Sequence, residues 1–180
     1  MKTRTLFAAS GLAMLAMTMG AASFAESTAS IDANAATALK QFNMMLPSNK
    51  KLQDRAAGVL VFPEVTKVGA GVAGEHGNGV LRIKGKTVGY YTTNSASVGL
   101  TLGAAKRSEI IMFMTQKSLD DFMASKGWSI GADTGIAVMK AGAGGEYDTE
   151  TSKKSILGFV YGEKGLMADV SLEGSKISKM

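Results

Sequence analysis

Apolar residues recur at three- and four-residue spacing in the first part of the chain that follows residue 25. They are Ile31, Ala35, Ala38, Leu39, Phe42, Met45 and Leu46. This period predicts an amphipathic helix, with Ser30 as its N-cap. Pro47 interrupts the pattern, and a second short helix is expected from about Ser48 to Ala57 before Gly58 ends it.

From residue 59 onward the pattern is typical of strands. Residues 59–62 form a continuous apolar run, residues 98–102 alternate, and residues 110–114 are apolar on both faces, as in a central strand. Asn78-Gly79 is a tight-turn signal between strands over 68–74 and 80–83, and Gly85 marks a second turn. Strands are expected again over 136–139, 156–161 and 166–172.

One further helix interrupts the sheet. Thr115 or Ser118 is expected to cap it, and Gly127 to end it. The 22 glycines of the chain fall largely within strand-like segments. Glycine at such positions marks bulges and sharp bends, although a glycine-lined ligand groove is the alternative. The sequence therefore predicts an α+β fold with a curved, mostly antiparallel, barrel-like sheet, two N-terminal helices and one inserted helix.

The first 25 residues have the pattern of a secretory signal peptide. Lys2 and Arg4 precede an apolar stretch from Leu6 to about Gly20, and small residues lead to a plausible cleavage site after Ala25. The expected organisation is a signal peptide over 1–25 and one domain over 26–180, in the periplasm or secreted. The chain has no cysteine, so it is not expected to be a lipoprotein.

The charge balance argues against nucleic acid as a partner. The formal net charge is +5, and it falls to +3 when Lys2 and Arg4 leave with the leader. No basic run is interleaved with aromatic residues, as single-strand binders require. Any electrostatic partner must therefore be recognised by a local patch.

Three strings resemble catalytic motifs but lack the required context. The glycine string over 69–74 is followed by a turn signal rather than a helix, and the order of elements around Ser129 is reversed for a nucleophile elbow. Ser48 and Lys51 lack the companion motifs of penicillin-interacting enzymes. One histidine, His76, and no cysteine leave a poor ligand set for a metal. No catalytic residue, metal site or cofactor is expected.

The two N-terminal helices carry the best candidate surface. Apolar Phe42 and Met45 precede the cationic residues Lys50, Lys51 and Arg55, which suits contact with an anionic membrane. The structural alternative is that these helices only cover the sheet.

Two further sets of residues extend this hypothesis. Lys106 and Arg107 enlarge the patch if folding brings them to the same face. Tyr90, Tyr91, Phe159 and Tyr161 are core residues or the lining of an apolar ligand pocket.

Several motifs together carry a family resemblance. The C-terminal run from Gly165 to Ile177 alternates apolar and polar residues, as a half-buried strand does. Upstream pieces lie at residues 58–63, 89–91, 97–100, 112–115 and 131–133. In this order they resemble the SYLF domain family over roughly residues 40 to 177. The resemblance implies the domain's fold. Eukaryotic SYLF domains are associated with phosphoinositide binding through an N-terminal amphipathic helix, and some with actin binding.

The sequence thus predicts an exported, non-enzymatic protein that binds lipid or a membrane surface, with anionic phospholipid as the partner. The alternatives are a protein-interaction module of the cell envelope and a soluble carrier of an apolar ligand.

Overall fold

The computed structural model describes residues 26–131, 135–141, 153–165, 172 and 174–180. The leader and most of the strand expected over 166–172 lie outside this part of the chain. The described elements are α1 (Thr28–Met45), α2 (Pro47–Arg55), β1 (Gly58–Ile83), β2 (Lys86–Phe113), α3 (Gln116–Ala124), β3 (Trp128–Ser129), β4 (Ile136–Lys140), β5 (Ile156–Gly165) and β6 (Lys176–Lys179).

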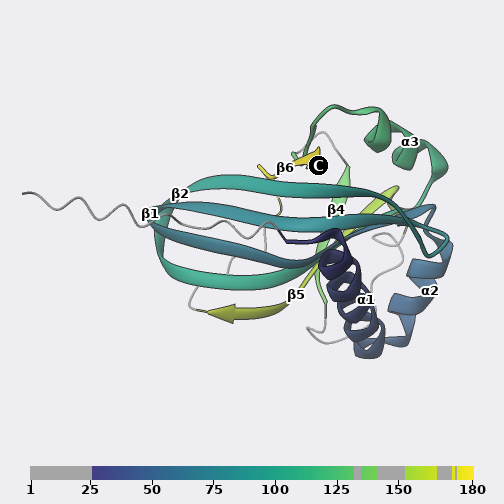
Figure 1. The fold of residues 1–180 in the computed structure, drawn as a ribbon, viewed down its shortest axis with the longest axis horizontal. Helices are drawn as coiled ribbons and strands as arrows, with labels where there is room; N and C mark the ends of the chain where they lie inside the picture. The colour runs from purple at the N-terminus through teal and green to yellow at the C-terminus, as the bar shows by residue number, and fades with distance from the viewer. Residues whose placement is uncertain (1–25, 132–134, 142–152, 166–171, 173) are drawn as a thin grey trace, which may run out of the picture.

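The centre of the fold is one very long antiparallel hairpin formed by β1 and β2 (Figure 1). Its turn is Lys84-Gly85, where both residues have positive φ angles of 49° and 78°. The turn expected at Gly85 is therefore confirmed, whereas the turn expected at Asn78-Gly79 is wrong. Asn78 and Gly79 lie inside β1 and pair with Thr92 and Tyr91.

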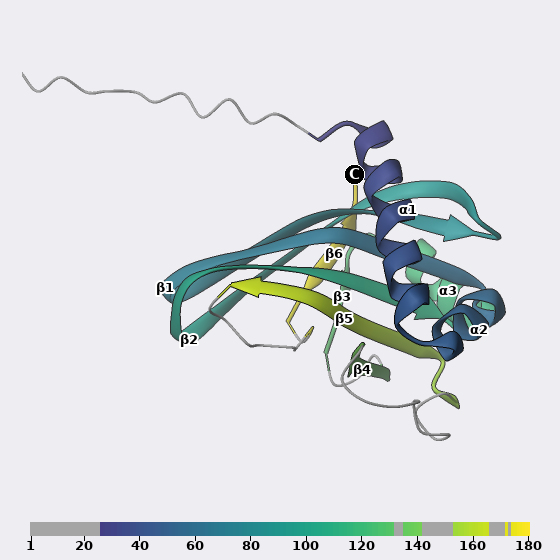
Figure 2. The same cartoon turned by 90° about the horizontal axis from the view of Figure 1, so that it is seen from below.

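The hairpin folds back on itself halfway along its length (Figure 2). A β-carbon on Gly79 would lie 2.4 Å from the ring of Phe62 and 2.5 Å from the carbonyl oxygen of Val61. The returning limb of β1 therefore lies directly against its outgoing limb, and glycine is needed at this contact. Gly79 serves this close approach rather than a turn.

The described strands form a six-stranded sheet in the order β3-β6-β2-β5-β4, with β1 paired to β2 off this path. All pairs are antiparallel except β4 with β5, which is parallel. The curled, mostly antiparallel sheet and its three helices confirm the α+β prediction.

The sheet is covered on both faces. On one face, α1 and α2 bury an apolar set that includes Phe42, Val61, Met112 and Phe159. On the other face, inside the curl, Phe62, Phe113 and α3 form the second apolar set with the C-terminal segment. The strands at the centre are consequently apolar on both faces, which explains the continuous hydrophobic runs in the sequence.

The helix ends follow capping rules, with one correction to an expected N-cap. The N-cap of α1 is Ser27, whose hydroxyl accepts from the Ser30 amide, so the helix starts earlier than expected. Leu46 precedes α2 without a side-chain cap, and Pro47 occupies the first helical position, where an amide would have no intrahelical partner. Thr115 caps α3 as expected. Among the described helices, none is long and apolar enough to cross a membrane.

Candidate lipid-binding surface

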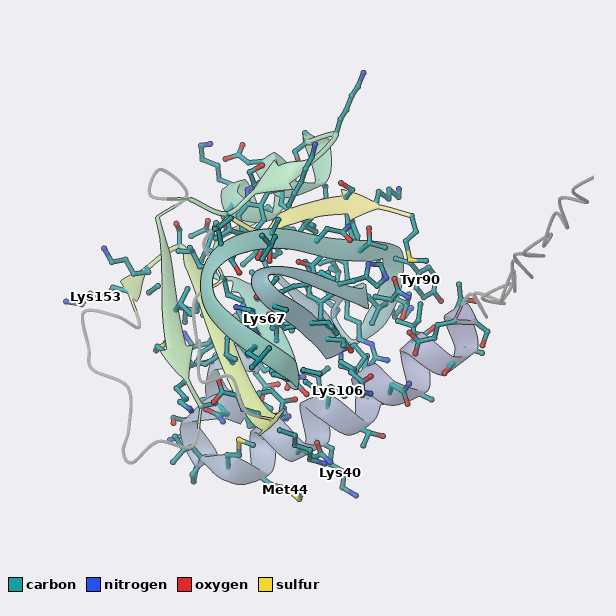
Figure 3. All side chains as sticks on the ribbon, turned by 90° about the vertical axis from the view of Figure 1, so that its left-hand side faces the viewer. Lys40, Met44, Lys67, Tyr90, Lys106 and Lys153 are labelled. Carbon is teal, nitrogen blue, oxygen red and sulfur yellow. The ribbon has the colours of Figure 1, made fainter. Side chains whose placement is uncertain are left out.

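The corner between α1 and α2 presents apolar and cationic side chains together. Met44 is 69% exposed and Met45 is 38% exposed, although both end a helix whose other face is buried. Figure 3 shows the side chains of Lys40 and Met44 projecting side by side from α1. We define the helical surface as the exposed residues Lys40, Met44, Met45, Lys50, Lys51 and Arg55.

This surface keeps a net positive charge. Lys50 forms an ion pair with Asp54 one turn later, and both side chains are more than half exposed. Such exposed pairs contribute little to stability. The helical surface has four cationic side chains, and Asp54 adds one carboxylate, which leaves an excess of about three positive charges.

The corner is held rigidly to the sheet. Asn49 is buried in α2, and its side-chain amide donates to the carbonyl oxygen of Phe42 at 2.6 Å. The Tyr161 hydroxyl donates to the carbonyl oxygen of Ala38 at 2.7 Å, and burial raises the pKa of Tyr161 to about 12. These bonds fix α2 against α1 and α1 against β5.

The start of α1 is held by a second set of polar contacts. The Asp32 carboxylate accepts hydrogen bonds from the hydroxyls of Thr87 and Tyr90, each at 2.6 Å. Arg82 donates to the Asp32 carbonyl oxygen at 2.8 Å. The hydrogen bond from Thr87, followed by that from Tyr90, lowers the pKa of Asp32. The same contact with Asp32 raises the pKa of Tyr90.

Phe42 does not contribute to the exposed surface. Its side chain is fully buried, and its ring lies 4.9 Å from that of Phe159 and 5.8 Å from that of Tyr161. Phe42 is therefore a core residue, and the expectation that it contacts lipid does not fit its position. Tyr91, Phe159 and Tyr161 are buried as well, so they are packed in the core rather than around an open pocket.

Arg107 is likewise buried, at 7% exposure, and is not available at the surface. Its Nη2 lies 2.7 Å from Glu75 Oε2 and its Nε lies 2.8 Å from Glu109 Oε1. Lys67 Nζ lies 3.0 Å from the other oxygen of Glu75. Burial raises the pKa of Glu109, and the charge of Arg107 opposes that effect. The expected role of Arg107 in a surface patch is corrected to a role inside the curl.

Lys106 is exposed but lies apart from α2. It pairs with Glu64 at 2.7 Å, and both side chains are more than half exposed. In Figure 3 it lies between the curled strands and α1. Met45 at the end of α1 and Lys50, Lys51 and Arg55 on α2 are therefore all exposed, whereas Lys106 lies on β2.

The hairpin turn brings two further cationic residues close to the helices, which local sequence patterns did not predict. Lys84 and Arg82 line a hollow of about 260 Å³ together with Leu39 of α1 and Asp54 of α2. A Lys at a positive φ angle is uncommon, because such turn positions favour Gly, Asn or Asp. The turn thus extends the cationic region toward β1.

Two features considered as candidate chemistry, His76 and the glycine string over 69–74, both lie in β1. No group of three His, Asp or Glu side chains in the described part of the chain is arranged to hold a metal ion. His76 lies within β1 rather than in a turn, and its Nδ1 lies 2.8 Å from Asn94 Oδ1. The glycine string over 69–74 lies in β1 and not at a strand-to-helix junction.

Comparison with known families agrees with the motifs. Residues 94–180 match the model of the family described as "Ysc84: Las17-binding protein actin regulator". This match, which covers just under half of the chain, is to the family whose domain is the SYLF domain, in agreement with the resemblance of the motifs.

A curated relative supports the same assignment. The chain is 31% identical over 160 residues to beta cell expansion factor A from Aeromonas veronii. The matched region covers 84% of this chain and 56% of that protein. The chain therefore spans about half the length of this relative.

Proposed function

We propose that this chain is an exported, non-enzymatic SYLF protein that binds the surface of anionic lipid membranes through its helical surface. One observation carries the proposal. Met44 and Met45 stand exposed at the end of α1, whose other face is buried in the core, and in sequence they fall between the exposed Lys40 of α1 and the exposed cations Lys50, Lys51 and Arg55 of α2. A helix that covers a sheet turns its apolar stripe toward that sheet, whereas Met44 is 69% exposed and projects beside Lys40 (Figure 3).

The magnitudes predict weak and salt-sensitive attachment. Each Lys or Arg near an anionic bilayer contributes about 1 kcal/mol, so a net excess of three charges supplies about 3 kcal/mol. That is less than the roughly 4 kcal/mol of a millimolar complex. Insertion of a methionine adds up to about 1.5–3 kcal/mol. Both terms together, about 4.5–6 kcal/mol, place the dissociation constant between about 0.5 mM and about 40 μM.

Export is part of the proposal, and it rests on the pattern of residues 1–25. The test is the intact mass of the protein recovered from the periplasm or medium of a bacterial host. A mass that begins at Glu26 supports cleavage, and a retained leader contradicts it.

Co-sedimentation with vesicles tests the function. The exported protein is mixed with vesicles of phosphatidylglycerol and phosphatidylcholine, or of phosphatidylcholine alone, at 0.1 M and 1 M salt, between which the Debye length falls from about 10 to about 3 Å. The variant K50E/K51E/R55E reverses three charges of the helical surface. The control K117E/K126E/K179E makes the same change in net charge at three exposed lysines that lie on α3, just after α3 and on β6.

The proposal predicts that the wild type and the control sediment with anionic vesicles, and that salt and the helical variant both weaken binding. Equal binding by the two variants would place the contact elsewhere. No binding by the wild type would contradict membrane binding. The family description names a protein partner, Las17, so an envelope protein is then the function to pursue.

A further inference from the structure

The end of the molecule opposite α2 presents an unusual apolar surface. Here β1 and β2 reverse direction, and we name residues 68–74 and 96–104 the hairpin bend (Figure 1). The pairing slips between Ala70 and Val72, and Gly71 and Gly103 take positive φ angles of 76° and 117°. Four aliphatic side chains of this bend are exposed: Val68 at 57%, Val72 at 61%, Val98 at 85% and Leu102 at 77%.

The bend contains no charged residue, and the charged residues beside it on β1 turn inward. No charged residue occurs over 68–74 or over 87–105. The charges that flank the bend on β1, Lys67 and Glu75, turn inward and pair with each other in the curl. Figure 3 looks onto this end and shows Lys67 inside the curled strands. Edge strands of soluble proteins normally carry outward charges that prevent association, and the bend lacks them.

The size of the patch favours lipid over a second protein chain. Four exposed aliphatic side chains amount to an area on the order of 400 Å². A stable protein interface buries about 800 Å² on each partner, so the patch is too small to hold a second copy on its own. The same patch at the end of an elongated molecule is well placed to enter the outer layer of a bilayer.

Cations lie where lipid headgroups would meet the bend. Lys106 on β2 and Lys164 on β5 are register partners and both are exposed. Lys106 lies three residues beyond Gly103, at the base of the bend. Long basic side chains at this depth reach phosphate groups while apolar residues sit below them.

We propose that the hairpin bend is a lipid-inserting surface, which places Val72, Val98 and Leu102 among the acyl chains while Lys106 and Lys164 contact anionic headgroups. This inference rests on the proposed membrane binding and assigns it a second, apolar contact. The bend and the helical surface lie at opposite ends of the long hairpin (Figure 1). From Gly58, which follows α2, to Ala70 the strand runs about 40 Å if fully extended.

The absence of cysteine makes a direct test possible. Single cysteines are introduced in the full, exported chain as V98C, M44C and K117C and labelled with an environment-sensitive nitrobenzoxadiazole dye. Vesicles of phosphatidylglycerol and phosphatidylcholine are then added at 1 M salt, which weakens the electrostatic contact of the helical surface. The inference predicts a brighter, blue-shifted signal at position 98, quenched by spin-labelled lipid, and no change at position 117.

A variant series supports the labelling. V72T/V98T/L102T places a β-branched side chain at each position, which suits a strand, but removes apolar surface. V88T is the control, since Val88 is an exposed strand valine outside the bend. Binding at 1 M salt should fall about tenfold or more in the triple variant and remain unchanged in the control. Thermal unfolding checks that both variants are folded.

The outcomes separate the two proposals. A wild type that sediments with vesicles but shows no dye response at position 98 overturns the inference and leaves membrane binding intact. A wild type that binds no vesicle overturns both. Concentration-dependent dimers in sedimentation velocity, abolished by the triple variant, would overturn the inference in favour of self-association.

Discussion

Glu75 accepts a hydrogen bond from Arg107 across the fold-back of the hairpin, with Oε2 2.7 Å from Nη2. The second oxygen of Glu75 lies 3.0 Å from Lys67 Nζ. Glu75 belongs to the returning limb of β1, whereas Lys67 and Arg107 belong to the outgoing limb of β1 and its partner stretch of β2. One carboxylate therefore ties the two halves of the curl together beneath the hairpin bend.

Removing this carboxylate should be costly. We expect Glu75→Gln to lower the free energy of unfolding by about 3 kcal/mol or more, because two buried cations lose a charged partner. Urea denaturation measures the loss. Glu64→Gln is the matched control, since its exposed pair with Lys106 should be worth less than about 1 kcal/mol. Equal losses in the two variants would contradict a structural role for the buried cluster.

The contact between α1 and the hairpin should depend on pH through Asp32. Its pKa is lowered from the ordinary 3.8, first by the hydrogen bond from Thr87 and then by that from Tyr90. A lowered pKa means that the stabilisation is present above pH 3.8 and is lost as pH falls through the folded-state value. Asp32→Asn should therefore cost about 1 kcal/mol at neutral pH, and its difference from the wild type should shrink in acid. A difference that is constant down to pH 2 would contradict this assignment.

Close approach at Gly79 should make this position intolerant of a side chain. A methyl group there would meet Phe62 and the backbone of Val61, so Gly79→Ala should destabilise by roughly 1–3 kcal/mol. The control is Gly74→Ala, where an added β-carbon meets nothing within 4 Å. Thermal unfolding of the two variants measures the difference, and equal midpoints would show that the limbs of the hairpin are not in contact.

Two lipid-contacting ends have a functional consequence. Because the helical surface and the hairpin bend lie at opposite ends, one molecule should bridge two vesicles, and the wild type should raise the turbidity of an anionic vesicle suspension. K50E/K51E/R55E and V72T/V98T/L102T should each abolish clustering, since each removes one end. Clustering that survives both changes would exclude this arrangement.

The helices and the class of fold were predictable from local pattern. Periodicity located α1, α2 and α3 to within a few residues, because each buries one face against the sheet. The Asn78-Gly79 signal failed for a physical reason. Asn-Gly favours a turn locally, but here the glycine is required by the distant Phe62, and sequence separation hides that contact.

The candidate surface was predictable only in part. Lys50, Lys51 and Arg55 are exposed as solvated cations usually are, whereas Arg107 has the same local signal and is buried. What separates them is the fold-back that places Glu75 opposite Arg107. The hairpin bend had a signal that was readable in the sequence, namely the charge-free run over 87–105. Its exposure follows from the curl, which no local pattern reveals.

Membrane binding is tested most directly by the binding isotherm of this protein on vesicles of phosphatidylglycerol and phosphatidylcholine, measured over a range of salt concentrations. We expect an affinity that falls as salt screens the helical surface and then levels off at a value above zero, maintained by the hairpin bend. The absence of binding at every salt concentration would contradict membrane binding by this protein.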